Sequence, residues 1–147
     1  MGNTMATTTQ ENKELVQRFI REANDKNYDR VAELLTADYT RRDPDTPGDE
    51  RGPEPFIEAL QRLHEAFPDS EVRVGEIVAE DDLVAFEGTM TGTHEGVFRG
   101  IEPTHETIDI PGNAMHRVRD GKIAETWATW NFLGALGQLG VTELPRE

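Results

Sequence analysis

The residues best suited to acid/base chemistry are His116 and Glu125, which flank an Asp120-Gly121 pair. Asp-Gly is typical of a two-residue β-hairpin turn, and pairing the flanking strands about it places His116 opposite Glu125. Apolar Ile123 shares their face, so we expect that face to point inward. An inward histidine and carboxylate need each other or water in a cavity, which predicts a catalytic couple in a pocket. A purely structural pair is the alternative, and a one-residue slip in either strand would exchange the faces.

The same register assigns further side chains to the pocket. Trp127 and Asn131 alternate onto the face of Glu125, so we expect both to line the cavity. We also assign Phe56 and Tyr39 to its wall. Together these residues predict a pocket that is mainly aromatic, with one acid/base couple.

The other histidines give weaker signals. His64 is expected to be a half-buried packing residue of a helix, whereas His94 and His105 fall in or beside loops and are expected to be solvated. No H-E-x-x-H or similar spacing is present, so we expect no metal site. Because the chain has no cysteine, disulfides and thiolate chemistry are excluded.

Several charged and aromatic residues are expected outside the catalytic couple. Arg41, Arg42 and Asp43 lie in a predicted loop that either rims the pocket or is simply solvated. Trp130 or Phe86 would form an apolar patch on the open face of the sheet. Such patches usually mark interfaces, which predicts a homodimer. Glu87 is likewise expected on the outer or dimer face.

Helical spacing of apolar residues predicts three helices in the first half of the chain. The first begins at a capping box with Thr8 as its N-cap, and the second covers residues 29–35. The third starts at Pro53, which suits a first helical turn, and is ended by Pro68. Residues 38–52 between the last two helices are expected to form a loop, with a short strand at 39–41.

After residue 70 the apolar period changes from helical to two, which predicts a meander of strands. The predicted strands cover residues 72–78 with a bulge at Gly75, then 83–93, 107–118 and 123–131. Pro111-Gly112 is expected to bend or bulge its strand, because proline cannot donate to a ladder. Residues 133–139 are expected to form a short closing turn or 3₁₀ segment.

Helices followed by a strand meander indicate an α+β fold and argue against a doubly wound sheet. We expect one domain over residues 10–141, between a polar tail at 1–9 and a C-terminal tail at 142–147. The residues expected to be largely buried are Phe19, Leu34, Phe56, Leu60, Val84, Phe86 and Val118.

The chain has 147 residues and a formal net charge of −14, with the acidic residues spread along its length. A nucleic-acid partner is not expected, because phosphate binding needs a basic face. No apolar run is long enough to cross a membrane, so we expect a cytoplasmic protein. The charge suits a halophilic protein in a salt-rich cytoplasm, and an ordinary acidic mesophilic protein is the alternative.

Several stretches resemble the SnoaL-like polyketide cyclase family of the NTF2-like superfamily. They occur in the family's order, and they are Phe67-Pro68-Asp69, Thr91-Gly92-Thr93-His94-Glu95-Gly96, Phe98 with Gly100, Arg119-Asp120-Gly121-Lys122-Ile123, Glu125-Thr126-Trp127, Leu133-Gly134 and Gln138-Leu139-Gly140. The resemblance implies an NTF2-like cone, in which three N-terminal helices pack on a curved, mainly antiparallel sheet around an apolar pocket. It also implies homodimers that pack through the sheet.

The chain departs from the family at residues that would carry the chemistry. Where family cyclases usually have His-Trp-Asp, with the Asp as acid/base, this chain has Thr126-Trp127-Ala128. The family's earlier His-Asp-Pro reads Arg42-Asp43-Pro44, and a further Asp is replaced by Asn131.

Two functions from different classes follow. The first is a pocket protein that catalyses acid/base cyclisation, isomerisation or hydration of a small apolar or polycyclic molecule without a cofactor, using His116 and Glu125. The second is a non-catalytic ligand-binding or dimerisation module of the same fold, which the alanine at position 128 favours.

Overall fold

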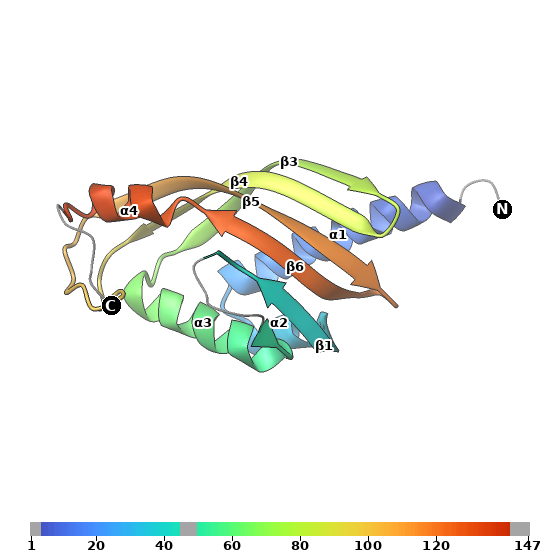
Figure 1. The fold of residues 1–147 in the computed structure, drawn as a ribbon, viewed down its shortest axis with the longest axis horizontal. Coiled ribbons are helices and arrows are strands. Elements are labelled where there is room, and N and C mark those ends of the chain that lie inside the picture. Colours follow the sequence, from blue (N-terminus) through green and yellow to red (C-terminus); the bar gives the residue numbers. More distant parts are fainter. Residues whose placement is uncertain (1–3, 45–49, 142–147) are drawn as a thin grey trace.

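The structure is a computed structural model and describes residues 4–44 and 50–141. It is a curved six-stranded sheet with helices along one face, here called the inner face (Figure 1). Helix α1 contacts β3 and β4, and α3 contacts β1 and β2. The helices are α1 (Thr4–Asn24), α2 (Tyr28–Glu33), α3 (Pro53–Ala66) and α4 (Phe132–Gln138). No helix in these described ranges is long and apolar enough to cross a membrane.

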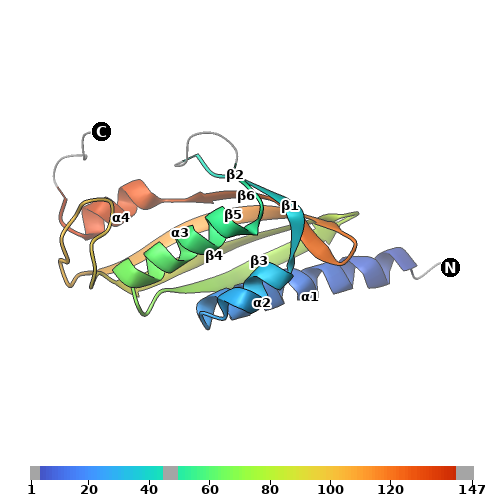
Figure 2. The same ribbon diagram turned by 90° about the horizontal axis from the view of Figure 1, so that it is seen from below.

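The strands are β1 (Leu35–Arg42), β2 (Glu50–Arg51), β3 (Glu71–Glu80), β4 (Leu83–Thr93), β5 (Thr107–Arg119) and β6 (Lys122–Trp130). Their order across the sheet is β2-β1-β6-β5-β4-β3, and β1 runs parallel to β6 while all other neighbours are antiparallel. The expected α+β fold, with helices on a curved and mainly antiparallel sheet, is confirmed. Figure 2 shows α1 and α3 on the same side of the sheet.

The helices differ from the predictions mainly at their ends. Helix α1 begins at Thr4, so Thr8 lies inside it rather than at its N-cap, and residues 4–9 of the expected tail are helical. Helix α2 starts and ends one or two residues earlier than predicted. Helix α3 begins at Pro53 as predicted, because a proline in the first turn leaves no donor unpaired. Residues 1–3 and 142–147 of the expected tails lie outside the described residues.

The segment after α2 is more ordered than a loop. A strand was expected only at residues 39–41, but β1 spans eight residues because it pairs with β6. That pairing joins residues far apart in sequence, so the local pattern does not carry it. Residues 45–49 of the predicted loop lie outside the described part of the chain.

The strand meander follows the predicted order. Strand β4 has the predicted bounds, and the register between β3 and β4 shifts between Val74 and Ile77, which confirms the bulge around Gly75. The strand was expected to bend or bulge at Pro111-Gly112, and of these the bulge is wrong, because β5 pairs with β4 through Pro111 without a register shift. The carbonyl of Pro111 accepts a hydrogen bond from Asn131 beyond the end of β6, so the missing N–H faces no strand.

The β5–β6 hairpin turns at Asp120 and Gly121, which have φ values of 54° and 77°. Both residues with positive φ indicate the expected type I′ turn. Arg119 pairs with Lys122, but the register then shifts by one residue, so that Arg117 pairs with Glu125. Ala124 is the extra residue of this β-bulge, and beyond it every side chain of β6 is on the opposite face from the predicted one.

Two regions near the end of the sheet also differ from expectation. Residues 132–138 form an α-helix rather than a turn, and Asn131 caps it by accepting a hydrogen bond from the Gly134 N–H at 3.0 Å. His94 is fully buried rather than solvated: its ring packs against Phe67, and its Nδ1 accepts a hydrogen bond from the Thr104 N–H at 3.1 Å. His105 is exposed as expected, and His64 is buried against Tyr28.

The core lies between the helices and the inner face of the sheet. Six of the seven residues expected there are buried: Phe19, Leu34, Phe56, Val84, Phe86 and Val118. Leu60 is the exception, because it is only half-buried and lines a cavity. Phe86 is inside the core rather than on the open face of the sheet, whereas Glu87 is exposed as expected.

Candidate functional site

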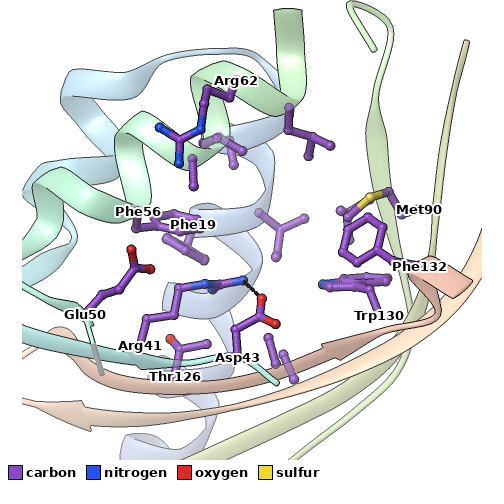
Figure 3. Close-up of a pocket in the computed structure, with 18 of the residues that line it drawn as sticks. Phe19, Arg41, Asp43, Glu50, Phe56, Arg62, Met90, Thr126, Trp130 and Phe132 are labelled. Atoms are coloured by element: carbon purple, nitrogen blue, oxygen red, sulfur yellow. Dashed lines mark ion pairs between the residues drawn. The ribbon is translucent and has the colours of Figure 1, made fainter. Parts of the chain in front are cut away.

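A cavity of about 510 Å³ lies between α1, α3 and the inner face of the sheet. Phe19 and Phe56 line one part of it, and Met90, Trp130 and Phe132 line another (Figure 3). Pockets with mostly apolar walls and a few polar groups are the usual form of small-molecule sites. This one is large enough for a ligand of two or more fused rings.

Arg41 and Asp43 form an ion pair in the wall of this pocket (Figure 3). Their charged atoms are 3.6 Å apart, and each side chain is only 15% exposed. The Arg41 guanidinium also lies over the Phe56 ring, 4.7 Å from its centroid. Alternation along β1 turns Arg41 inward, and Asp43 follows directly after the strand ends. The charge cluster that the sequence left as either rim or solvated therefore belongs to the pocket wall.

His116 also lines the pocket, and it is buried. Its Nδ1 lies 2.8 Å from the Thr126 hydroxyl, and its Nε2 has no hydrogen-bond partner among the described residues. Phe86 stacks on its ring, and Phe19 meets it edge-on. Burial, together with the smaller effect of the nearby Arg41 charge, lowers the pKa of His116 to about 3. His116 is therefore neutral near pH 7 and is suited to hydrogen bonding rather than to accepting a full proton.

The predicted pairing of His116 with Glu125 is wrong. His116 faces Thr126 instead, because the Ala124 bulge shifts the register by one residue. Glu125 lies on the opposite face of the sheet, here called the outer face. There it accepts hydrogen bonds from Arg42 at 2.6 Å and from Arg117 at 3.0 Å. The hydrogen bond from Arg42 is the largest cause that lowers the pKa of Glu125, so this carboxylate stays ionised.

The two tryptophans exchange their expected positions for the same reason. Trp127 was expected in the pocket but lies on the outer face, where the Arg42 and Arg117 guanidinium carbons are 5.4 Å and 5.9 Å from its ring centroid. Trp130 was expected on the open side of the sheet but lines the pocket. The two tryptophans therefore lie on opposite faces of the sheet, as expected, but each lies on the face predicted for the other.

The other three predicted pocket residues have different outcomes. Phe56 lines the pocket, in agreement with its assignment. Tyr39 is buried behind Phe56, with ring centroids 6.3 Å apart, and is not among the lining residues. Asn131 is exposed and caps α4 instead of lining the pocket.

The sequence analysis did not predict Thr126 as a pocket residue, and it did not predict that Arg41 and Asp43 form an ion pair there. One signal could have found the first: Ile123 and Ala124 are consecutive apolar residues, and both are buried. Two neighbouring inward residues break the alternation of a regular strand and indicate a bulge. Arg41 and Asp43 are two residues apart, so alternation along a strand places them on one face, but their position in the pocket depends on how β1 joins the sheet.

A metal centre finds no support in the geometry. Within residues 4–44 and 50–141, no three histidine, aspartate or glutamate side chains come together in a way that could hold a metal ion. The charged residues that line the pocket are mixed in sign: Arg41, Asp43, Glu50, Arg62, Glu65 and Arg99.

Known structures share this architecture. AclR from Streptomyces galilaeus, provisionally assigned as a hydroxylase, is 27% identical with a TM-score of 0.82, over 94% of this chain and 87% of AclR. IdmH from Streptomyces antibioticus, provisionally assigned as a polyketide cyclase, is 31% identical with a TM-score of 0.79, over 88% of this chain and 99% of IdmH. A provisionally assigned SnoaL-like polyketide cyclase from Jannaschia sp. CCS1 is 25% identical with a TM-score of 0.83, over 92% and 95% of the two chains.

No curated protein matches the chain significantly. The family model of the SnoaL-like polyketide cyclases matches residues 14–139, a range that includes nearly all of the sheet and its helices. Because this match spans the elements that build the pocket, the chain belongs to the SnoaL-like polyketide cyclase family.

Proposed function

We propose that this protein is an acid/base enzyme that acts, without a cofactor, on a small and mainly apolar ketone in the pocket. The reaction class is isomerisation, aldol-type cyclisation or hydration, each of which begins or ends with proton transfer next to a carbonyl. The observation that carries this proposal is the Arg41–Asp43 ion pair, which is nearly buried against an apolar cavity.

Asp43 and Arg41 have complementary roles in such a reaction. The Asp43 carboxylate takes a proton from the carbon next to the ketone, and the C–H electron pair moves to give an enolate. Arg41 stabilises the negative charge that develops on the enolate oxygen. In a cyclisation the enolate carbon then attacks a second carbonyl, and the proton held by Asp43 neutralises the new alkoxide. No step consumes an oxidant or a reductant.

The position of Asp43 fits the departure at residue 128. Ala128 lines the pocket, and its methyl group cannot accept a proton. Among the described residues, three carboxylates line this cavity: Asp43 after the end of β1 forms an ion pair with Arg41, Glu50 lies on β2, and Glu65 is exposed on α3. Asp43 is therefore the carboxylate that we assign as the base, in place of Glu125.

The test uses 2-tetralone, a bicyclic ketone with exchangeable C–H protons. We expect the wild-type protein to accelerate exchange of these protons with D₂O, followed by NMR. Asp43→Asn should lower the rate about 100-fold or more while 2-tetralone still binds. Glu125→Gln is the matched control, because it removes a carboxylate from the outer face, and it should exchange at the wild-type rate. An Asp43→Asn variant as fast as wild type would contradict the proposal.

The second candidate is a non-catalytic ligand-binding module of the same fold. Two features favour it: Ala128 lacks a carboxylate, and burial lowers the pKa of His116 to about 3. The same experiment separates the two functions. Binding of 2-tetralone without any acceleration of exchange in the wild-type protein would support the module and reject the enzyme.

We also propose a homodimer that packs through the outer face of the sheet. Trp127 lies on this face between two arginines, and Met115 beside it on β5 is 36% exposed. An aromatic residue and arginines at the centre of a patch are typical of interface anchors. Sedimentation should give about twice 16.5 kDa, and Met115→Glu should give the monomer. A wild-type monomer at micromolar concentration would reject this interface.

We further propose that the protein binds a small-molecule ligand and is located in the cytoplasm.

A further inference from the structure

Another arginine lies on the side of the pocket away from Arg41. Arg99 lines the pocket, and its guanidinium carbon is 5.3 Å from the Phe98 ring centroid and 4.9 Å from that of Phe132. Phe132 lies across the cavity from Phe56, the ring that Arg41 covers (Figure 3). The pocket therefore has an arginine on each of two opposite sides, and each guanidinium lies over aromatic rings of the pocket wall.

A tight turn presents Arg99 to the pocket. The Phe98 N–H donates to the Ile101 carbonyl at 3.0 Å, and the Ile101 N–H donates to the Phe98 carbonyl at 2.8 Å. Between them Arg99 and Gly100 have φ values of 50° and 80°, which is the pattern of a type I′ turn. Glycine, asparagine and aspartate suit the first of these positions, as Asp120 does in the β5–β6 hairpin. The turn alone does not explain an arginine there, and residues in a disfavoured backbone conformation are often functional.

The turn is fixed to the elements around it. The N–H groups of Glu95 and Gly96 both donate to the Ala66 carbonyl at the end of α3, at 2.9 Å and 3.1 Å. Phe98 is buried, and its ring meets that of Phe67 edge-on with centroids 5.2 Å apart. The first residue of the turn is thus carried on a packed support, which suits a group that must hold a ligand in one position.

The charge and exposure of this side of the pocket indicate what it would bind. The end of α3 beside the turn adds Arg62 and Glu65 to the pocket lining, so two arginines and one carboxylate meet there. Arg99 is exposed, so a ligand in the pocket can reach it. A guanidinium that stacks on rings through its face binds a carboxylate through its N–H edge, in a planar pair of hydrogen bonds.

We propose that Arg99 binds a carboxylate substituent of the ligand, so that the substrate class is a keto acid with an apolar ring system between its two polar groups. The ketone end rests on the proposed function and lies at the Arg41–Asp43 pair. The carboxylate end rests on Arg99 and its two rings. Arg99 determines specificity and takes no part in proton transfer, because it lies across the pocket from that pair.

The test compares two ligands of nearly the same shape, the 6-carboxylate and the 6-carboxamide of 2-tetralone, whose substituent is on the ring remote from the ketone. By calorimetry near pH 7, the wild type should bind the carboxylate at least about fivefold more tightly. Arg99→Asn suits the turn, so it should fold, and it should bring the two affinities within about twofold. Arg73→Gln removes a charge from a side chain that is 73% exposed on β3, and it should keep the wild-type ratio.

The outcomes separate this inference from the proposed function, because the affinity ratio is measured without turnover. Equal affinities in the wild type would overturn the inference, as would an unchanged ratio in Arg99→Asn or a failure of both ligands to bind. An Arg73→Gln variant that also loses the preference would overturn it too, since net charge and not a defined contact would then select the acid. If the ratio behaves as expected but proton exchange is not accelerated, the carboxylate site stands and only the enzyme is rejected.

Discussion

His116 and Thr126 pair across β5 and β6, with the histidine Nδ1 2.8 Å from the threonine hydroxyl on the inner face of the sheet. The histidine ring is fully enclosed by this contact and by Phe19 and Phe86. Such a ring is held neutral by its surroundings, and that has a measurable consequence for stability.

Stability should fall as the pH falls below 6.5. The pKa of His116 is about 3 in the folded protein and about 6.5 in the unfolded chain, so over this interval only the unfolded state binds the extra proton. From pH 7 to pH 5 the loss should be about 2 kcal/mol from this group alone. His116→Gln should remove that part of the slope in urea unfolding curves recorded at each pH. Equal slopes for the two proteins would show that His116 is not held neutral.

Glu125→Gln should leave the pocket unchanged. Glu125 and its arginine partners lie on the outer face and are partly exposed, with side-chain exposures of 27% for Glu125 and 38% for Arg42. Ion pairs this exposed contribute little, so we expect a loss of less than about 1 kcal/mol in the free energy of unfolding. Calorimetry should give an unchanged affinity for 2-tetralone. A large loss of affinity would mean that Glu125 reaches the ligand.

Leu60→Ala should cost less than truncation of a residue that is enclosed on all sides. Leu60 is half-buried and faces the cavity, so the substitution leaves little new empty volume between packed atoms. We expect about 1–2 kcal/mol for Leu60→Ala, against about 2–5 kcal/mol for Ile110→Ala at a fully buried position of β5. Urea unfolding of both variants measures the difference. Equal costs would show that Leu60 belongs to the packed core.

Local sequence patterns were sufficient for most elements of this fold. The Asp120-Gly121 turn, the strand over residues 83–93 and the proline start of α3 each depend on a few neighbouring residues. Phe67-Pro68-Asp69 and the other resembling stretches then pointed to the family that the comparison confirms.

The candidate site was predicted less well, because its residues depend on register and on long-range pairing. A single extra residue, Ala124, turns Thr126 inward and Glu125 outward. The one sequence signal for this bulge is that Ile123 and Ala124 are consecutive apolar residues, and both are buried. The place of the Arg41–Asp43 pair in the pocket depends on the parallel contact of β1 with β6, which joins segments separated by about eighty residues.

Salt should stabilise the protein if the halophilic proposal is correct. With a net charge of −14, repulsion between carboxylates opposes the compact state in dilute buffer, and salt screens it. We expect the Tm to rise markedly between dilute buffer and molar KCl, measured by differential scanning calorimetry. A flat response would identify an ordinary acidic protein.

The contact between Gly112 and Trp130 fixes one wall of the pocket. A Cβ added at Gly112 would overlap the Trp130 ring and approach the Thr129 carbonyl oxygen at 2.7 Å. The Trp130 ring can therefore pack this closely against β5 only because residue 112 has no side chain. Gly112→Ala should push Trp130 into the cavity, lower the free energy of unfolding by about 1–3 kcal/mol and weaken 2-tetralone binding.

Two further variants separate this contact from a general effect of replacing glycine. Gly137→Ala in α4 meets nothing within 4 Å, so it should leave affinity unchanged and stabilise the helix by about 0.5–1 kcal/mol. Trp130→Leu shortens the group that clashes, so Gly112→Ala should cost less in that background than in the wild type. Urea unfolding of the four proteins in this cycle gives the coupling between the two positions. Additive costs would mean that Gly112 does not position Trp130, and that the pocket wall is set by other contacts of the ring.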